Sequence, residues 1–570
     1  MSNQLLAVCL DCGHTFDYIP IPITCPRCNS AWLEAHYDYS SLGMALPASL
    51  YHRPFNLWRY RELLPVADYN PDLTLGEGGT PLVRAINLGM MLGCPNLFIK
   101  DERQGPTNSF KDRQAAISIY ALKEAGITEA VLASTGNVAI AYSAYAARAG
   151  IKLWAFLTSL VPIEKMREVA FYGTQVVKVT GSYDQAKQVA AEFARQRDLY
   201  LERGARSIPS VESMKTIAFE VCEQLAYYHD YAGKNALTES NFDDSSPRLV
   251  KFQAPDWYLQ SVSGGIGPLG VQKGFFELKE MNLTNRIPAM GNIQAEGCAP
   301  MVHAWRKGEE VAEPVKVPRT HIATLSTGDP GRTYTLLFQR MKKSAGGVFE
   351  SVSDEETFHT MHILAKMEGI SVEPAAAVAF AGLVKLVRAG KIKPDDVVVI
   401  NCTGHTMPVE HDILGDGWSK DVEYPSQALG ETPQEGLLAA LSRITPDRYA
   451  LIEIVDDLPD ARRLIRRVLQ AQGEYTLLEA SNGSEALEIA QRELPDLIIL
   501  DLMMPEMDGF SVLDALKSNA KTGAIPVIVV TAKELTPEEE KRLRGRIHAL
   551  MQKGEFMSDE LMDEVRSVLD

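Results

Sequence analysis

The stretch Thr107 to Arg113 places Lys111 where a loop is expected to pass into a helix. A second loop of similar character, Ser134 to Asn137, follows it along the chain. A lysine becomes a Schiff-base nucleophile when its amine is partly desolvated and a carbonyl compound is held close to it. We therefore predict that Lys111 anchors a carbonyl-containing cofactor.

A glycine-rich turn lies between an apolar strand that ends at Val262 and a helical stretch from Val271 to Leu278. Its residues are Ser263, Gly264, Gly265, Ile266 and Gly267. Glycines in this position let successive backbone amides point at a phosphate near the start of a helix. The turn is therefore predicted to bind phosphate.

A second group of reactive side chains lies in the last part of the chain, at the ends of predicted strands. It consists of Asp456, Asp457, Asp501, Thr531 and Lys553. Carboxylates clustered at strand ends bind Mg²⁺ through hard oxygen atoms, and the metal then neutralises an incoming phosphoryl group. This pattern predicts a magnesium and phosphoryl site.

Four of the eight cysteines form two C-x-x-C pairs: Cys9, Cys12, Cys25 and Cys28. Two tight turns can aim these thiolates at one tetrahedral centre, which is the geometry of a zinc ribbon. With all four positions filled by protein, the zinc would be structural, and free or redox-active thiols are the alternative. The other four cysteines are scattered and are expected to be core thiols in a reducing compartment.

Short apolar runs alternate with helical patterns, such as Asp112 to Ala125, between Leu73 and about Thr406. The predicted strands are Leu97 to Lys100, Ala130 to Ala133, Lys152 to Leu157, Gln175 to Val179, Trp257 to Val262, Ile293 to Glu296 and Val397 to Asn401. This alternation is typical of α/β layers with a mainly parallel sheet, where ligands bind at the carboxyl ends of strands. The candidate loops all lie at such ends.

The chain is predicted to have four parts: residues 1–40, 41–410, 411–448 and 449–570. The first is the zinc ribbon, the third a linker with a short helix at 436–444, and a polar segment at 233–248 is a predicted surface insertion. The last part is a separate doubly wound domain. Its predicted strands are Ala450 to Val455, Tyr475 to Glu479, Leu497 to Leu500, Val527 to Thr531 and His548 to Gln552.

The composition of the chain narrows its possible partners. Its 570 residues carry a net charge of −17, with 46% hydrophobic and 23% charged residues, which are globular values. Nucleic acid is excluded as the main partner, because a phosphate backbone requires a basic surface. No segment approaches the roughly 20 consecutive apolar residues of a membrane span, and the first ten residues do not resemble a signal peptide. We expect a cytoplasmic protein without a membrane partner.

Four motifs together resemble the threonine synthases: GEGGTPL at Gly76 to Leu82, KDE at Lys100 to Glu102, SFKDR at Ser109 to Arg113 and STGN at Ser134 to Asn137. The resemblance covers residues 1 to about 410 and implies a two-lobed α/β enzyme of pyridoxal-phosphate fold type II, the tryptophan-synthase β fold. It implies that Lys111 carries the cofactor, that Asn137 lies beside its phenolic oxygen and that Thr403 faces the pyridine nitrogen. From the residues alone, Asn137 as a helix cap and Thr403 bonded to nearby backbone stay open.

The resemblance also implies a lyase reaction, in which O-phosphohomoserine and water give threonine and phosphate. The substrate region departs from the family, because Ser210 stands where an arginine usually precedes the Lys215–Thr216 pair. A dianionic phosphate is then poorly paired unless Arg206 or Lys215 reaches it. Other replacement or elimination reactions stay open, such as a cysteate-synthase-like reaction on phosphoserine or a dehydration.

The motifs IVDD, LDLMMPEMDG and VVTAK resemble those of response-regulator receiver domains, which have a flavodoxin-like (βα)5 fold. The resemblance implies a magnesium site made by Asp456, Asp457, Asp501 and the backbone carbonyl of Met503. It implies further that Asp501 accepts a phosphoryl group, that Thr531 senses it and that Lys553 pairs with it. The implied partner is a histidine kinase or a phosphotransfer protein.

Two hypotheses remain for the whole chain. In the first, the chain is a pyridoxal-phosphate lyase acting on a small phosphorylated amino acid, and a receiver tunes or localises it. In the second, it is a signalling protein in which the enzyme fold senses a ligand or serves as a scaffold and the receiver carries the output. Lys111 and Asn137 favour the first, whereas Ser210 favours the second. A homodimer is expected, because it is the commonest assembly of soluble enzymes.

Overall fold

The computed structural model describes residues 5–21, 24–67, 69–134, 136–158, 161–181, 183–232, 249–405, 449–473, 475–533, 535–553 and 558–569. These residues form two compact units, a larger one built mainly from residues up to 405 and a smaller one built mainly from residues 449–569. The predicted insertion at 233–248 and the predicted linker at 411–448, with its helix, lie outside the described residues.

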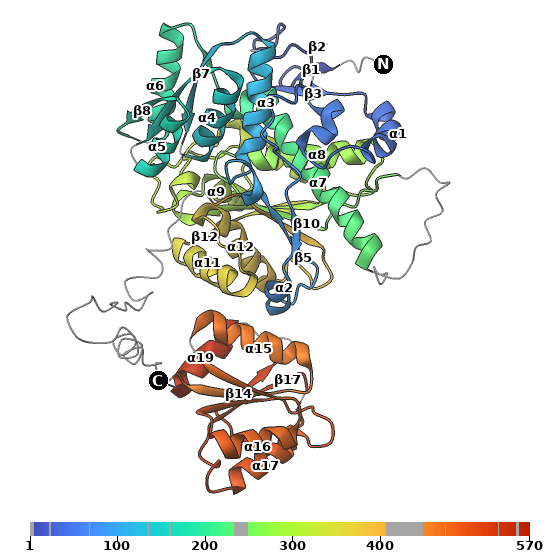
Figure 1. Ribbon diagram of the computed structural model, residues 1–570, viewed down its shortest axis with the longest axis vertical. Coiled ribbons are helices and arrows are strands. Elements are labelled where there is room, and N and C mark those ends of the chain that lie inside the picture. Colours follow the sequence, from blue (N-terminus) through green and yellow to red (C-terminus); the bar gives the residue numbers. More distant parts are fainter. Residues whose placement is uncertain are drawn as a thin grey trace, which may run out of the picture. The chain divides into compact units, whose positions relative to one another are not determined.

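The larger unit contains a central six-stranded sheet (Figure 1). In spatial order its strands are β12 (Gly347–Val352), β11 (Ala289–Ala295), β10 (Trp257–Ser261), β13 (Val398–Cys402), β5 (Leu97–Asp101) and β4 (Leu82–Arg84). All neighbours are parallel except β4, which pairs antiparallel with β5 at the edge. Every residue of β11, β13 and β5 is buried, as expected for strands covered on both faces.

A second sheet forms the other lobe of this unit and lies with α6 at the upper left of Figure 1. Its order is β8 (Gln175–Val179), β7 (Lys152–Thr158), β6 (Glu129–Ser134) and β9 (Tyr200–Leu201), and all neighbours are parallel. The carboxyl ends of parallel strands meet at one edge of each sheet, so loops that follow the strands come together.

Helices cover both sheets. Up to residue 405 the helices are α1 (Tyr39–Leu50), α2 (Ile86–Met91), α3 (Lys111–Glu124), α4 (Asn137–Ala149), α5 (Ile163–Phe171), α6 (Tyr183–Gln196), α7 (Ile208–Ala232), α8 (Ile266–Glu280), α9 (Pro300–Lys307), α10 (Arg332–Lys342), α11 (Asp354–Glu368) and α12 (Pro374–Arg388). Short 3-10 turns occupy Leu57–Leu63, Glu102–Gln104, Gly204–Arg206, Glu296–Cys298 and Ala323–Leu325. The nearly all-apolar α12 packs on β10, β11 and β13, while α3 packs between α4 and α7.

A small antiparallel sheet at the start of the chain packs on the larger unit. Its order is β2 (Thr15–Asp17), β1 (Leu6–Cys9) and β3 (Leu33–His36). Two ionic contacts attach it to α10, from Arg340 to Glu34 at 2.8 Å and from Arg332 to Asp11. So few residues cannot build a core alone, so attachment to a larger body is expected.

The smaller unit is a five-stranded parallel sheet in the order β15 (Thr476–Ala480), β14 (Leu451–Val455), β16 (Leu497–Leu500), β17 (Val527–Thr531) and β18 (Ala549–Gln552). Its helices are α15 (Pro459–Gln472), α16 (Gly483–Glu493), α17 (Gly509–Ser518), α18 (Pro537–Leu543) and α19 (Ser558–Leu569). The strand order 2-1-3-4-5 is that of the flavodoxin-like fold, so the predicted fold is confirmed.

Most predicted strands coincide with observed ones to within one or two residues. Strands β4, β9 and β12 were not predicted. Among the predicted strands, the main difference is at β11, which begins at Ala289, four residues before the predicted start at Ile293. Its first residues, Ala-Met-Gly-Asn, include a glycine and lack β-branched side chains, so propensity does not mark them. Glu296, predicted as strand, begins a 3-10 turn instead.

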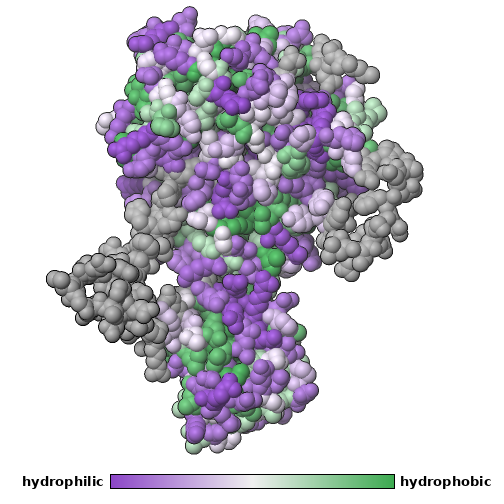
Figure 2. Space-filling view, in the orientation of Figure 1, coloured by the Kyte–Doolittle hydropathy of each residue, from purple (hydrophilic) through white to green (hydrophobic). Residues whose placement is uncertain are grey.

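The visible surface of the described residues is mostly hydrophilic, with small apolar areas between polar ones (Figure 2). Among the residues that the structure describes, none of the helices combines the length and apolar character required to cross a membrane.

Candidate active site

A cavity of about 570 Å³ lies in the larger unit, where loops from both sheets meet. All eight residues predicted to bind the cofactor line it: Lys111, Asn137, Ser263, Gly264, Gly265, Ile266, Gly267 and Thr403. They belong to four segments that are far apart in the sequence. The parallel topology brings them together, because the segments follow strands β5, β6, β10 and β13.

Lys111 is the first residue of α3, as the loop-to-helix prediction required. The loop before it is fixed to the segment that carries Thr403, through a hydrogen bond from Phe110 N to Thr403 O at 3.0 Å and another from His405 N to Asn108 O at 3.0 Å. Burial lowers the pKa of the Lys111 amine to about 8, and the carboxylate of Glu373 acts in the opposite direction. About a tenth of this amine is therefore uncharged at pH 7, far more than for an ordinary lysine.

Glu373 is a functional candidate that the sequence did not reveal. It is buried, lines the cavity and precedes Pro374 at the start of α12. The side-chain amide of Asn137 donates to its Oε1 at 2.9 Å. Asn137 has no capping role, because it is the first residue of α4 after Gly136 and its amide binds another helix. The available signal was an isolated glutamate directly before Pro374 and a run of buried apolar residues.

The glycine-rich turn passes directly into α8, whose N-cap residue is Gly265 with φ of 89°. That conformation strains any other residue, and a Cβ there would lie 2.7 Å from Thr333 Cγ2. The hydroxyl of Ser263 is 2.6 Å from Thr327 Oγ1. The first amides of α8 have no partner within the helix, so they form the donor set that an anion requires.

Thr403 follows β13 and is nearly fully buried at the edge of the cavity. Its hydroxyl has no hydrogen bond to any of the residues described by the structure, whereas its backbone oxygen accepts from Phe110 N. The alternative of a threonine bonded to local backbone is therefore not supported. The hydroxyl can bind a ligand in the cavity.

The two cations proposed to replace the missing arginine are placed differently. Lys215 is fully buried and binds Glu212 at 2.5 Å and Glu277 at 3.0 Å, so it cannot reach the cavity. Ser210 is also fully buried, with its hydroxyl 2.9 Å from Glu202 Oε1. Arg206 is exposed and lines the cavity. Only Arg206 of these three is available to a ligand.

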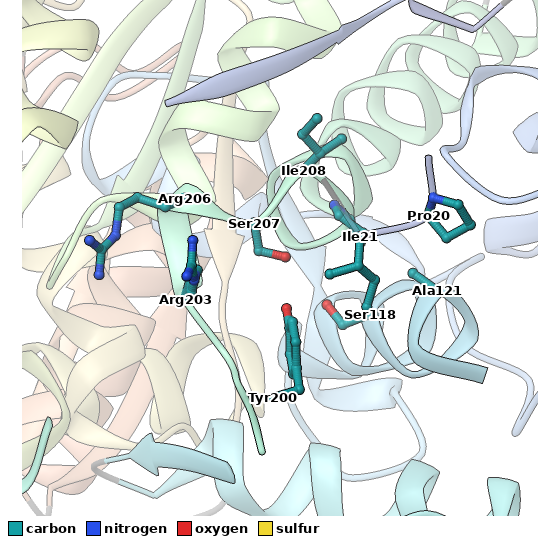
Figure 3. A pocket seen from close by; sticks show the side chains of 10 residues that line it. Pro20, Ile21, Ser118, Ala121, Tyr200, Arg203, Arg206, Ser207 and Ile208 are labelled. Atoms are coloured by element: carbon teal, nitrogen blue, oxygen red, sulfur yellow. The ribbon is translucent and has the colours of Figure 1, made fainter. Parts of the chain in front are cut away.

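Arg203 and Arg206 lie on one side of a small adjoining pocket of about 20 Å³, and Pro20 and Ile21 lie on the other (Figure 3). Tyr200 and Ser118 are between the two sides. This pocket has room for about one water molecule. Because the arginines line both spaces, they mark a cationic end of the large cavity.

The four predicted zinc ligands are gathered in the N-terminal sheet. The Sγ atoms of Cys9, Cys12, Cys25 and Cys28 all lie within 4.8 Å of one another. Cys9 and Cys28 are 3.5 Å apart, and Cys12 and Cys25 are 3.7 Å apart. Thiolates around one tetrahedral zinc with bonds of ~2.3 Å have sulfur separations of ~3.8 Å. The thiols therefore fit one zinc ion.

The acidic cluster of the smaller unit lies at the carboxyl ends of β14 and β16. The carboxylate oxygens of Asp456, Asp457 and Asp501 lie within 4.8 Å of one another. Lys553 Nζ is 2.6 Å from a carboxylate oxygen of both Asp456 and Asp501. Burial raises the pKa of Asp456, and Lys553 acts against this effect. A divalent cation fits here, because two or three carboxylates share one small space.

The other predicted residues of this cluster are placed as expected. Thr531 is buried at the end of β17, and its backbone oxygen accepts from Lys553 N at 2.8 Å. Met503 follows Asp501 closely and donates its backbone N–H to Asp501 Oδ1 at 3.2 Å. Both residues therefore lie close to the acidic cluster.

Comparison with known families decides what kind of protein this is. The family model described as "Pyridoxal-phosphate dependent enzyme" matches residues 73–404. The chain belongs to this family. A second model, described as "Response regulator receiver domain", matches residues 452–566, so the smaller unit contains a receiver domain.

Two relatives of this pyridoxal-phosphate dependent enzyme are threonine synthases. That of Methanocaldococcus jannaschii is 35% identical over 403 residues, which are 70% of this chain and 92% of the relative. That of Methanosarcina acetivorans is 32% identical over 400 residues, 70% of this chain and 91% of the relative. The chain is therefore a pyridoxal-phosphate dependent lyase with threonine-synthase relatives.

A solved structure, the processed form of threonine deaminase isoform 2 from Solanum lycopersicum, is similar over 59% of this chain and 86% of that one. Its sequence identity is 19% and its TM-score is 0.46.

The residues of the cavity fit pyridoxal phosphate. A lysine whose pKa is lowered by burial suits a carbonyl partner, and the free amides at the start of α8 suit a phosphate. The unbonded Thr403 hydroxyl suits a ring nitrogen, because it neither forces a proton onto the ring nor adds negative charge. The cavity volume is within the range of small-molecule sites.

Proposed function

We propose that this enzyme converts O-phosphohomoserine and water into threonine and phosphate. The observation that carries the proposal is the convergence of Lys111, Asn137, the glycine turn and Thr403 on one cavity. The named relatives, of which the chain covers nine tenths, support the same reaction.

In this proposal the enzyme's own residues divide the work of holding the cofactor. Lys111 is the covalent anchor, the amides of Ser263 to Gly267 bind the phosphate, and Thr403 faces the ring nitrogen. Asn137 is placed to donate to the phenolic oxygen, with Glu373 holding its amide. When bound, pyridoxal phosphate supplies an electron sink for negative charge at the substrate's Cα.

Proton movement is assigned to Lys111. Its amine, once free of the cofactor, would be the base nearest to the substrate, and in the empty cavity burial lowers its pKa to about 8. This amine takes protons from Cα and then from Cβ, and the phosphate at Cγ departs with its bonding electrons. The two protons return, one to Cγ and one to Cα, while water supplies the hydroxyl group at Cβ and its remaining proton to the departing phosphate, so threonine and phosphate are the products.

The substrate's phosphate is assigned to the cationic end of the cavity. Arg206 is available there, and Lys187 lines the same cavity while paired with Asp184 at 2.5 Å. Arg206 offers a planar pair of donors, which suits a phosphate dianion. In this proposal Arg206 takes the role of the arginine that related enzymes carry at the position of Ser210.

A substrate panel tests the reaction. O-phosphohomoserine, phosphoserine, serine and threonine are compared, with released phosphate, keto acid and new amino acid measured together. Threonine and phosphate in equal amounts, from phosphohomoserine alone, are expected. A sulfite-dependent replacement on phosphoserine would support a cysteate-synthase-like reaction instead, and keto acid from serine or threonine would support a dehydratase. No product with any of the four would support a ligand-sensing role.

For the receiver, we propose that Asp456, Asp457, Asp501 and the carbonyl of Met503 hold Mg²⁺ and that Asp501 is the phosphoacceptor, with Thr531 and Lys553 responding to the phosphoryl group. Their placement around one acidic space supports this. The phosphodonor would be a histidine kinase or phosphotransfer protein.

We further propose that Cys9, Cys12, Cys25 and Cys28 hold structural zinc. The parts of the chain would end at residues 40, 410 and 448, and the enzyme would be a homodimer.

A further inference from the structure

One wall of the cavity comes from the N-terminal segment that carries Cys9, Cys12, Cys25 and Cys28, which we call the ribbon, rather than from the two large sheets. Trp32, which lies between Cys28 and β3, lines the cavity together with the cofactor residues. Its backbone oxygen accepts from Leu10 N at 2.9 Å, so it is attached to the first cysteine turn. The indole is half-buried and packs against the core of the larger unit.

Arg332 joins this tryptophan to the same cysteine turn. Its guanidinium pairs with Asp11, which lies between Cys9 and Cys12, and donates to Leu10 O at 3.2 Å. The guanidinium carbon is 5.7 Å from the centre of the Trp32 ring, within the range of a cation–π contact. One side chain therefore fixes the indole relative to the ribbon.

The segment before Arg332 continues the wall to the glycine turn. Asp329, Pro330 and Gly331 line the cavity directly before Arg332. Thr327, two residues earlier than Asp329, bonds to Ser263 at 2.6 Å. Residues 327–332 therefore connect the ribbon to the glycine turn along one side of the cavity.

We propose that Trp32 contacts the side chain of the substrate. Arg332 is the positioning residue that holds the Trp32 indole against the cavity. The cofactor contacts are supplied by Lys111, Asn137, the glycine turn and Thr403, so the indole is left for the amino acid. Arg332 is occupied by Asp11 and Leu10 and does not itself bind the ligand. This inference rests on the proposed function and adds the ribbon to its substrate site.

The test uses the full-length, cofactor-loaded enzyme. Trp32→Ala, Trp32→Phe and Arg332→Gln are compared with the wild type for KM and kcat on O-phosphohomoserine, and for threonine affinity by calorimetry. We expect Trp32→Ala and Arg332→Gln to raise KM and the threonine dissociation constant roughly tenfold, with little change in kcat, because an aromatic contact with the ligand is lost. Trp32→Phe keeps a ring and is expected to recover most of the affinity.

Arg340→Gln is the matched control. Arg340 lies on the same helix and also pairs with the ribbon, through Glu34, but it does not line the cavity. Unchanged binding in this variant, with zinc content and cofactor content equal in all variants, supports the proposal. Equal losses of affinity in Arg340→Gln and Arg332→Gln would overturn the proposal, because they would mean that only attachment of the ribbon matters. Unchanged affinity in Trp32→Ala would also overturn it. A wild type that binds threonine without forming it refutes the proposed reaction alone, while absence of both binding and turnover refutes both proposals.

Discussion

The side-chain amide of Asn137 donates a hydrogen bond of 2.9 Å to the carboxylate of Glu373. The two residues stand at the starts of α4 and α12, and both line the cavity that contains Lys111. Burial lowers the pKa of Lys111 to about 8, and Glu373 opposes that effect. The Glu373 carboxylate therefore both orients the Asn137 amide and favours the charged form of the Lys111 amine.

Replacing Glu373 by glutamine is expected to lower the pKa of Lys111 further, because the negative charge that raises this pKa is removed. Below its pKa the amine is charged and unreactive, so the reactive range extends to lower pH. The measurement is the rate at which an amine reagent modifies Lys111 in cofactor-free protein, followed by peptide mass spectrometry against pH. Glu350→Gln, outside the cavity lining, is the control. A midpoint that moves upward in Glu373→Gln would contradict this account.

Arg206→Gln is expected to raise KM for O-phosphohomoserine by roughly tenfold or more, because a charge-assisted pair with phosphate is lost. Binding of a ligand that lacks the phosphate, such as serine, is expected to change little. Arg197→Gln is a suitable control, because Arg197 stacks over Phe193 at 4.5 Å and does not line the cavity. Equal losses for phosphorylated and unphosphorylated ligands would show that Arg206 does not bind the phosphate.

Asp501→Asn is expected to abolish labelling of the receiver by a small phosphodonor, because the acceptor carboxylate is removed. Labelling of the wild type is expected to require Mg²⁺ and to stop when the metal is chelated. Glu506→Gln provides the control, since Glu506 is an exposed acid in the same loop. Undiminished labelling of Asp501→Asn at another residue would refute the assignment.

Glu453 is a buried acid in the core of the receiver, on β14, and neither of its carboxylate oxygens has a hydrogen bond to any residue that the structure describes. Burial raises its pKa to about 8, with a further contribution from Glu485. The unfolded chain has the lower pKa, about 4.3. The contribution of Glu453 to the free energy of unfolding therefore falls as pH rises from the pKa of the unfolded chain to that of the folded one. The fall is complete above pH 8.

Glu453→Leu is expected to stabilise the receiver by about 2 kcal/mol or more at pH 8, and much less near pH 4. Native-state hydrogen exchange of the β14 and β16 amides in the full chain measures this difference. Glu488→Leu is the control, because the Glu488 side chain is 75% exposed on α16. A gain in stability that is independent of pH would contradict the proposed titration.

Cys25→Ser is expected to lose zinc and to increase hydrogen exchange in β1 and β3, because structural zinc supplies the folding energy that so small a sheet lacks. Metal content and exchange are measured on the same sample. Cys222→Ala removes an equally buried thiol outside the cluster and is expected to keep its zinc. Full zinc content in Cys25→Ser would exclude this cysteine as a ligand.

Local sequence patterns were sufficient for much of the fold and site. The apolar runs of β5, β13 and β16 and the loop-to-helix position of Lys111 are determined by neighbouring residues, so they could be predicted. Long-range contacts could not. Glu373 and Asn137 are 236 residues apart, and the ion pairs that sequester Lys215 depend on the packing of α7 against α8. The contribution of Trp32 to the cavity depends in the same way on how the ribbon attaches to α10.

Borohydride reduction of the cofactor-loaded protein tests the central claim most directly. Lys100, Lys215 and Lys273 are also buried, but each is paired with a carboxylate at close range, whereas Lys111 lines the cavity. After reduction and digestion, the account predicts the mass of reduced pyridoxal phosphate on the peptide that contains Lys111 and on no other. A label on another lysine, or no label on protein that holds the cofactor, would contradict it.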